Sequence, residues 1–261
     1  MPKKPKPKHL PIQPELGPQI GQGQDNHVFD MLHPAEKPHL RQSTGWVVKV
    51  SHEANSNKAL RTRHEDSREA AWRGIQYKKN KYDILKHFLG NAIPDSAFVL
   101  SKVDPGTAKE RYVELTMQQK VPQVSLNALS EEQRQDPRLH NNVAGLLKNM
   151  QYMYGVLGEV NARTSNAINL DAKMDLGGIS DVVRGERLDH AFTDDEVAGI
   201  INSNSSPNLL VDPETMQPYC IDFDQGQWAE GMDDAKRLAF EIDARNQRIG
   251  GPAGYLALRA Q

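Results

Sequence analysis

Asn208 and Asp222 are the residues of this chain whose types and spacing point most directly to chemistry. They flank two short apolar runs, Leu209–Val211 and Tyr219–Ile221, which enclose the turn-forming segment 212–217. A hairpin built from these runs places one polar residue just before its first strand and the other just after its second. Amide and carboxylate oxygens are hard ligands that suit Mg²⁺. The sequence therefore predicts a magnesium site formed by Asn208 and Asp222.

A glycine-containing segment near the start of the chain can approach phosphate groups. Gly21 and Gly23 are followed by Val28, and Asn26 stands where a third glycine would complete the spacing G-x-G-x-x-G-x-V. Glycines allow backbone N–H groups to come close to phosphate oxygens, and Asn tolerates positive φ better than most residues. A glycine-containing hairpin without a ligand is the open alternative for this segment.

Lys49 lies in the apolar run Trp46–Val50, which is typical of a strand. The positive charge of a strand lysine that follows a glycine-containing hairpin suits phosphate groups. The alternative is a lysine that faces solvent, which is the common state of strand lysines.

With these motifs in this order, the chain resembles the protein kinase-like superfamily from about Ile20 to Trp228. It is similar to the small bacterial and aminoglycoside-phosphotransferase-like kinases, and within them to the PhoP-regulatory-network kinase-like proteins. The resemblance implies an α+β, bilobal protein kinase-like fold with a β-rich N-lobe, one long helix and a compact helical C-lobe. It also implies ATP as the phosphate donor and Mg²⁺ as the cofactor.

The resemblance assigns a role to each matching residue. Lys49 and Asp222 are the expected catalytic residues, because they orient and neutralise the phosphates, and Asn208 and Asp222 are the expected metal ligands. The backbone from Met117 to Gln119 would bind adenine. The expected nucleotide-binding residues are Gly21, Gly23, Val28, Lys49, Glu69, Met117 and Gln119.

The glutamate that pairs with the strand lysine in such proteins has no clear match here. Lys81 occupies its place in the run Lys81–Leu85, which otherwise resembles the usual helix segment. Glu69 and Glu65 lie earlier on the same predicted helix, and we assign the role to Glu69. Two surface glutamates on a charged helix face are the alternative.

The position of the catalytic aspartate also departs from the pattern. Ser203 stands five residues before Asn208, where the family places the base. A missing general base costs about 10²–10⁴ in rate. Asp189, Asp194 and Asp195 lie upstream and could act in its place. Two interpretations therefore stay open: a phosphotransferase with an unknown acceptor, which we prefer, and a pseudokinase that binds nucleotide or a partner without efficient phosphotransfer.

The elements that must position these residues follow from periodicity and from turn signals. A basic, proline-rich tail over residues 1–15 is expected to be disordered, followed by an N-lobe over 16–120 and a C-lobe over 121–261. The expected strands are Leu16–Ile20, Val28–Met31, Trp46–Val50, Ala97–Leu100 and Tyr112–Met117. The expected helices are 58–89, Leu139–Val160, Asp194–Ile201 after the cap Thr193, and Met232–Arg248.

Composition excludes several classes of protein. The formal net charge of −2 gives no support for nucleic-acid binding, and no run of 18 apolar residues predicts a transmembrane segment. The single cysteine, Cys220, excludes an internal disulfide framework and fits a cytoplasmic location. In a predicted strand it is better read as a small buried filler than as a reactive thiol. The expected partners are a nucleotide and an unknown small-molecule or protein acceptor.

Overall fold

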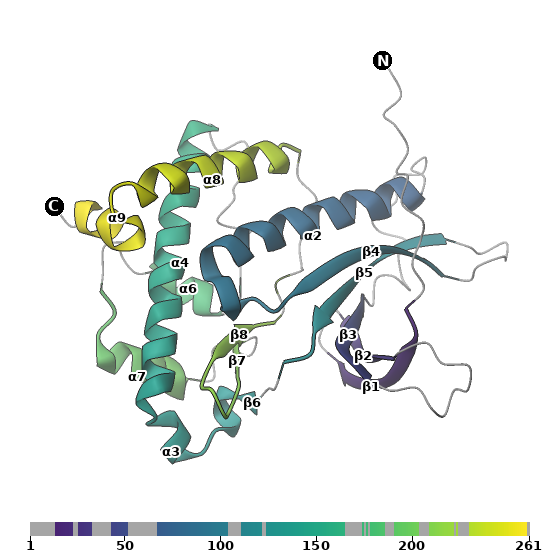
Figure 1. Cartoon of the computed structure of the whole chain (residues 1–261), viewed down its shortest axis with the longest axis horizontal. Helices are drawn as coiled ribbons and strands as arrows, with labels where there is room; N and C mark the ends of the chain where they lie inside the picture. The colour runs from purple at the N-terminus through teal and green to yellow at the C-terminus, as the bar shows by residue number, and fades with distance from the viewer. Residues whose placement is uncertain are drawn as a thin grey trace. The chain divides into compact units, whose positions relative to one another are not determined.

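The computed structural model describes residues 14–22, 26–32, 43–51, 67–103, 111–121, 124–164, 174, 176, 178–185, 191–203, 209–221, 223 and 230–259 (Figure 1). They form an α+β protein with two compact units. The first unit is Met1–Lys79 with Asp95–Lys120, and the second is Asn80–Pro94 with Val121–Gln261. The chain passes from the first unit to the second inside its long helix, between Lys79 and Asn80. It returns between Pro94 and Asp95 and passes to the second unit again between Lys120 and Val121.

The first unit contains a five-stranded antiparallel sheet with the order β1-β2-β3-β5-β4. Each expected strand is present, and each is longer than its apolar run because backbone pairing continues into polar residues. The bounds are β1 Leu16–Gln22, β2 Asn26–Leu32, β3 Ser43–Ser51, β4 Ser96–Val103 and β5 Arg111–Gln119.

The two faces of this sheet bury different side chains, as the alternation of strand residues requires. One face carries the cluster Val48, Val113 and Leu115, with Val50 and Met117 packed against it. On the other face, Leu100 packs with Ala71 and Ile75 of helix α2, Ser67–Leu89. The sequence prediction of a β-rich region combined with one long helix is therefore confirmed (Figure 1).

Helix α2 was expected over residues 58–89, and the described part of it runs from Ser67 to Leu89. Residues 58–66 of that expectation lie outside the described residues. The helix ends at the short 3-10 turn η2, Gly90–Ala92, in which Gly90 adopts φ +57. Glycine enters this left-handed region at low cost, which makes Gly90 the expected stop signal.

The second unit is mostly helical and also holds a small antiparallel sheet with the order β6-β7-β8. The expected helices near 139–160, 194–201 and 232–248 are confirmed within a few residues at their ends. The sequence analysis did not predict β6, α3, α6 and α9. Strand β6 and helix α3 have only two and four residues, and α6 and α9 begin at glycine. The bounds are β6 Val124–Ser125, η3 Leu126–Ala128, α3 Glu131–Arg134, α4 Pro137–Arg163, α6 Gly178–Gly185, α7 Asp194–Asn202, β7 Leu209–Val211, β8 Pro218–Cys220, α8 Met232–Gln247 and α9 Gly251–Arg259.

Helix α4 is the centre of the second unit's core. Its side chains Val143, Leu147, Met150 and Met153 are fully buried, which confirms the apolar face read from their spacing. Its first residue, Pro137, follows the N-cap Asp136, whose side chain accepts from the N–H of Arg138. No helix within the described part of the chain is long and apolar enough to cross a membrane.

Candidate functional site

The residues that the sequence assigns to one site fall in both units. Gly21, Val28, Lys49, Glu69, Met117 and Gln119 belong to the first unit, and the segment that carries Asn208 and Asp222 belongs to the second. The expected positions Gly23, Asn208 and Asp222 lie outside the described residues.

In the first unit, three of the expected residues share one row across the sheet. Gly21 of β1 lies opposite Val28 of β2, and Val28 lies opposite Lys49 of β3. The row continues to Thr116 of β5 and then to Phe98 of β4. Directly opposed residues of antiparallel strands place their side chains on the same face. Strand register therefore brings Val28 and Lys49 together with Thr116, which sequence reasoning did not single out.

Lys49 is 7% exposed, so it is not the solvent-facing lysine of the alternative interpretation. Three further polar residues are buried at positions whose register gives the same face: Asp30, Thr116 and Gln118. A lysine ammonium is rarely buried in a purely apolar place, because its desolvation is costly. This face of the sheet thus carries a polar strip around Lys49, and Lys120 extends it with an ion pair to Asp30 at 3.7 Å.

Gly21 is not required by the backbone or by packing. A Cβ added there would lie 3.6 Å from the Cβ of Val28, which is an ordinary contact, and its φ is not in the left-handed region. The pairing of β1 with β2 is irregular between Gln19 and Gly21. A glycine that the fold does not need is consistent with a backbone that a ligand approaches closely.

Glu69 lies in the first turn of α2, and its side chain is exposed. Among the described residues, no ion pair joins it to Lys49. The acidic group that does bind this part of α2 is Glu114 of β5, whose carboxylate pairs with Lys78 at 3.2 Å. Gly74 leaves the space that the Glu114 side chain occupies.

Met117 and Gln119 belong to β5, where they pair with Val48 and Trp46 of β3. The Met117 side chain packs on the face of the sheet opposite to Lys49, against the Val48 cluster. The backbone N–H of Gln119 donates to the carbonyl of Asp95 at 2.8 Å. A nucleotide base at this edge would therefore have to use other main-chain groups of the segment.

In the second unit, the expected hairpin is present. Strands β7 and β8 pair with Leu209 opposite Cys220 and Val211 opposite Pro218. The second strand begins one residue earlier than expected. Leu209 directly follows Asn208 in the sequence, and Cys220 is two residues before Asp222, so the strand ends next to both residues are paired.

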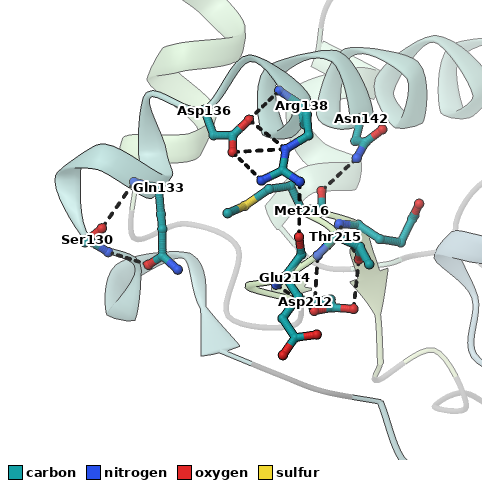
Figure 2. Close-up of polar contacts among 10 residues, drawn as sticks. Ser130, Gln133, Asp136, Arg138, Asn142, Asp212, Glu214, Thr215 and Met216 are labelled. Atoms are coloured by element: carbon teal, nitrogen blue, oxygen red, sulfur yellow. Dashed lines mark hydrogen bonds and ion pairs between the residues drawn. The ribbon is translucent and has the colours of Figure 1, made fainter.

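The hairpin turn is closed by Asp212 (Figure 2). Its Oδ1 accepts from the backbone N–H of Glu214 at 2.9 Å, and its Oδ2 accepts from the Thr215 hydroxyl at 2.8 Å. These bonds, led by the one from Glu214, hold the pKa of the Asp212 carboxyl below its usual value. The turn chemistry read from Asp212 is thus confirmed.

Helix α4 holds the same turn from outside. Asn142 donates from Nδ2 to the Met216 carbonyl at 2.9 Å, and Arg138 donates from Nη1 to the Glu214 carbonyl at 3.2 Å (Figure 2). Arg138 is itself fixed by Asp136, with Nη2 and Oδ2 2.7 Å apart. Met216 has φ 58, the one positive φ at a described residue other than glycine. Two side chains of α4 therefore fix a turn that the sequence alone does not connect to that helix.

Two residues close to Asp222 in the sequence, Cys220 and Phe223, are buried. Phe223 is fully buried, and its ring stacks on Tyr82 of α2 with 5.9 Å between the centroids. Cys220 is buried, which raises the pKa of its thiol to about 12. The interpretation of this cysteine as a buried filler is therefore confirmed.

Ser203 is the C-cap of α7. Its hydroxyl donates to the carbonyl of Ile200 at 3.0 Å, so it serves the end of the helix. Asp194 and Asp195 lie in the first turn of the same helix, at its other end. Asp189 lies outside the described residues.

Sequence reasoning also missed a buried carboxylate on α8. Asp243 accepts from the Tyr152 hydroxyl at 2.5 Å and from Gln247 at 2.9 Å, and its Oδ2 lies 2.9 Å from His87 Nε2. It therefore joins α2, α4 and α8. A polar residue at a helix position that periodicity makes buried is the signal that could have found it.

Among the described residues, no three His, Cys, Asp or Glu side chains are grouped as metal ligands. In comparisons with known proteins, the chain matches no protein-family model, no curated protein and no solved structure.

Proposed function

We propose that this chain binds ATP with Mg²⁺ and acts as a phosphotransferase with a kinase-like fold. Lys49 orients the nucleotide phosphates, and Asn208 and Asp222 hold the metal. The proposal rests first on Lys49: a buried lysine that shares a row of the sheet with Gly21 and Val28, the residues expected to contact the phosphates and the base. The acceptor is a small molecule or a protein.

The burial of Lys49 supports this role because a buried ammonium group loses its hydration, and polar or negatively charged groups must compensate for that loss. Buried charged groups of this kind are often found at functional sites. Its surroundings are polar, with Thr116 and Gln118 buried on the same face. The unneeded glycine at position 21 supports a close approach of phosphate in the same row.

The hairpin of the second unit supports the metal half of the proposal. The turn between β7 and β8 is bound both by Asp212 and by α4. In the sequence, Asn208 directly precedes β7 and Asp222 is the second residue after β8. A rigid hairpin suits a metal site, since ligands must be held in place before the metal binds.

The first experiment measures the thermal stability of the protein with ATP, with and without Mg²⁺. A ligand that binds only the native state at 100 times its dissociation constant stabilises that state by about 2.7 kcal/mol, so MgATP should raise the melting temperature. The increase should disappear in Lys49→Met and in Asp222→Ala. Lys102→Met, a lysine of β4 in the same sheet, is the matched control and should keep the increase.

Gly21→Ala separates ligand contact from folding. Because the added Cβ fits, the unliganded melting temperature should stay unchanged while the MgATP-dependent increase falls. Wild-type protein that shows no increase at millimolar MgATP would contradict nucleotide binding altogether.

The second candidate function is a pseudokinase that binds nucleotide without efficient transfer. Ser203 favours it, since its hydroxyl caps α7 and no carboxylate stands at that sequence position. ATP turnover decides between the two functions: release of ADP that is lost in Lys49→Met supports the enzyme. MgATP binding with no ADP release beyond that of Lys49→Met supports the pseudokinase.

A further inference from the structure

Two opposite charges are buried on one face of the five-stranded sheet. Lys49 of β3 is 7% exposed, and Asp30 of β2 is 8% exposed. Burial removes water from both groups, and neither an ammonium nor a carboxylate is stable in that state without compensation. Each of the two charges therefore needs an opposite charge or strong hydrogen bonds in its surroundings.

Strand register brings the two residues to neighbouring positions. Lys49 lies directly opposite Val28, and Asp30 lies opposite Val47. Because alternate residues of a strand share a face, Asp30 stands on the face of Lys49, at a diagonal position of the adjacent strand. Diagonal neighbours are about 7–8 Å apart, a distance that long side chains can bridge. The lysine side chain is therefore long enough to reach this aspartate.

Acidic residues are scarce in this sheet. Its five strands hold two of them, Asp30 and Glu114. The Glu114 carboxylate is engaged with α2, where it pairs with Lys78 at 3.2 Å and occupies the space beside Gly74. Asp30 forms an ion pair with Lys120 at 3.7 Å, but the Lys120 side chain is 43% exposed, so water screens this interaction. Of the two carboxylates, Asp30 thus suits the buried lysine of β3 better.

We propose that Asp30 is the positioning residue of Lys49. The inference rests on the proposed function, in which Lys49 binds the nucleotide phosphates. The carboxylate keeps the ammonium charged and holds it beside Val28, in the row of the sheet that also contains Gly21. A counter-charge on β2 takes the place of the helix glutamate that the resemblance expects, and it explains why Glu69 stands exposed.

A double-mutant cycle tests the pair without any ligand. Thermal unfolding compares the wild type, Asp30→Asn, Lys49→Met and the double variant. Asp30→Asn should lower the melting temperature, because a buried ammonium loses its counter-charge, and it should cost much less in the Lys49→Met background. An Asp30→Asn protein that fails to fold while the double variant folds would support the pairing. Equal losses in the two backgrounds, or a failure to fold in both, would overturn it.

Nucleotide binding tests the positioning. Isothermal titration calorimetry measures the affinity for MgATP and for adenosine, which has no phosphates. Asp30→Asn should weaken MgATP binding about tenfold, the effect of one lost charge contact at short range, and should leave adenosine binding unchanged. Asp30→Glu keeps the charge and should retain most of the MgATP affinity. An unchanged MgATP affinity in Asp30→Asn, or an equal weakening of both ligands, would overturn the proposal.

Two control variants remove neighbouring charges. Glu114→Gln neutralises the other carboxylate of the same face, and Lys120→Met removes the exposed partner of Asp30. Both should keep the wild-type affinity for MgATP. A loss in Lys120→Met as large as that in Asp30→Asn would overturn the proposal, since Asp30 would then act through Lys120.

The two measurements also separate this inference from the proposed function. A wild type that binds MgATP while the cycle shows no coupling between Asp30 and Lys49 defeats the inference alone. A wild type that binds neither MgATP nor adenosine defeats the proposed function, and the positioning role with it, even where the cycle shows that the two residues pair.

Discussion

The two ends of helix α2 are held in different ways. Residues up to Lys79 belong to the first unit, where Ala71 and Ile75 pack on Leu100 and one ion pair joins Lys78 to Glu114. Residues from Asn80 onward belong to the second unit, where polar side chains bind α8 directly. There Lys236 contacts both Asn80 and Asp83, and His87 contacts Asp243.

The two ends of α2 differ in how strictly their contacts depend on particular side chains. Apolar contacts such as those of Ile75 depend on volume and accept similar side chains. Buried polar contacts have to be satisfied, so a missing partner is costly. The second end of α2 therefore combines the deeper burial with the stricter requirements, and it is also the end that contacts Phe223.

The largest expected effect sharpens the contrast in burial. Leu85→Ala, at a fully buried position of the second end, should lower the free energy of unfolding by about 3–5 kcal/mol. Ile75→Ala at the first end should cost less, about 2–3 kcal/mol, because the site lies nearer to solvent. Urea unfolding measures both losses of stability. A larger loss for Ile75→Ala would contradict the deeper burial of the second end of α2.

The next effect tests the polar contacts. Asp243→Ala removes the acceptor of Tyr152, Gln247 and His87 and should cost about 3 kcal/mol. Asp234→Ala on the same helix is the control, since that side chain is 81% exposed and pairs only across the surface. The free energy of unfolding of the control should stay within about 0.5 kcal/mol of the wild type. Equal losses in the two variants would show that the buried contacts of Asp243 do not stabilise the protein more than an exposed ion pair does.

Acid should weaken the second end through the same carboxylate. Burial by itself raises the pKa of Asp243, but hydrogen bonds from Tyr152, Gln247 and His87 bring it below the ordinary 3.8. A lowered native pKa adds stability above the unfolded pKa, and this stability is lost as the pH falls through the native pKa. The stability difference between the wild type and Asp243→Asn, measured in urea, should therefore shrink below about pH 4. A stability difference that stays constant as the pH falls well below 4 would contradict the assignment.

The smallest effect concerns Gly74 at the first end. An alanine Cβ would overlap the Glu114 carboxylate, which can rotate away and give up its contact with Lys78. Better helix propensity of about 1 kcal/mol offsets that loss, so the net change should stay within about 1 kcal/mol.

Gly155→Ala in α4 provides the counterpart, because there the Cβ would meet the rigid ring of Tyr255 at 2.7 Å. It should cost about 1–3 kcal/mol. Thermal unfolding compares the two variants, and a Gly74→Ala protein that loses as much as Gly155→Ala would show that Glu114 cannot move.

Local patterns predicted much of the fold. Short apolar runs bounded by turn signals located the five strands of the first unit, and Asp212 identified the turn between β7 and β8. Thr193 gave the start of α7, where a capping box with Glu196 is present. These features depend on neighbours in sequence, which is why a single chain reveals them.

Contacts between distant residues were not predictable in this way. The row from Gly21 to Thr116 follows from the register of four strands, and the contact between Asn142 and Met216 spans 74 positions. Sequence spacing could not show that Glu69 stands exposed while Glu114 binds α2. The sequence therefore identified candidate residues of the proposed site, but it could not predict which distant residues they contact.

Because Cys220 is buried, the reaction of its thiol can be used to measure how often the hairpin opens. Only a thiolate reacts quickly with alkylating reagents, and this thiol is both inaccessible and hard to ionise. Labelling therefore requires a transient opening of β8, and the labelling rate depends on how frequently β8 opens. Because the chain has one cysteine, the signal comes from a single place. The labelling rate of Cys220 in the intact protein therefore measures the local stability of strand β8, which precedes Asp222 in the sequence.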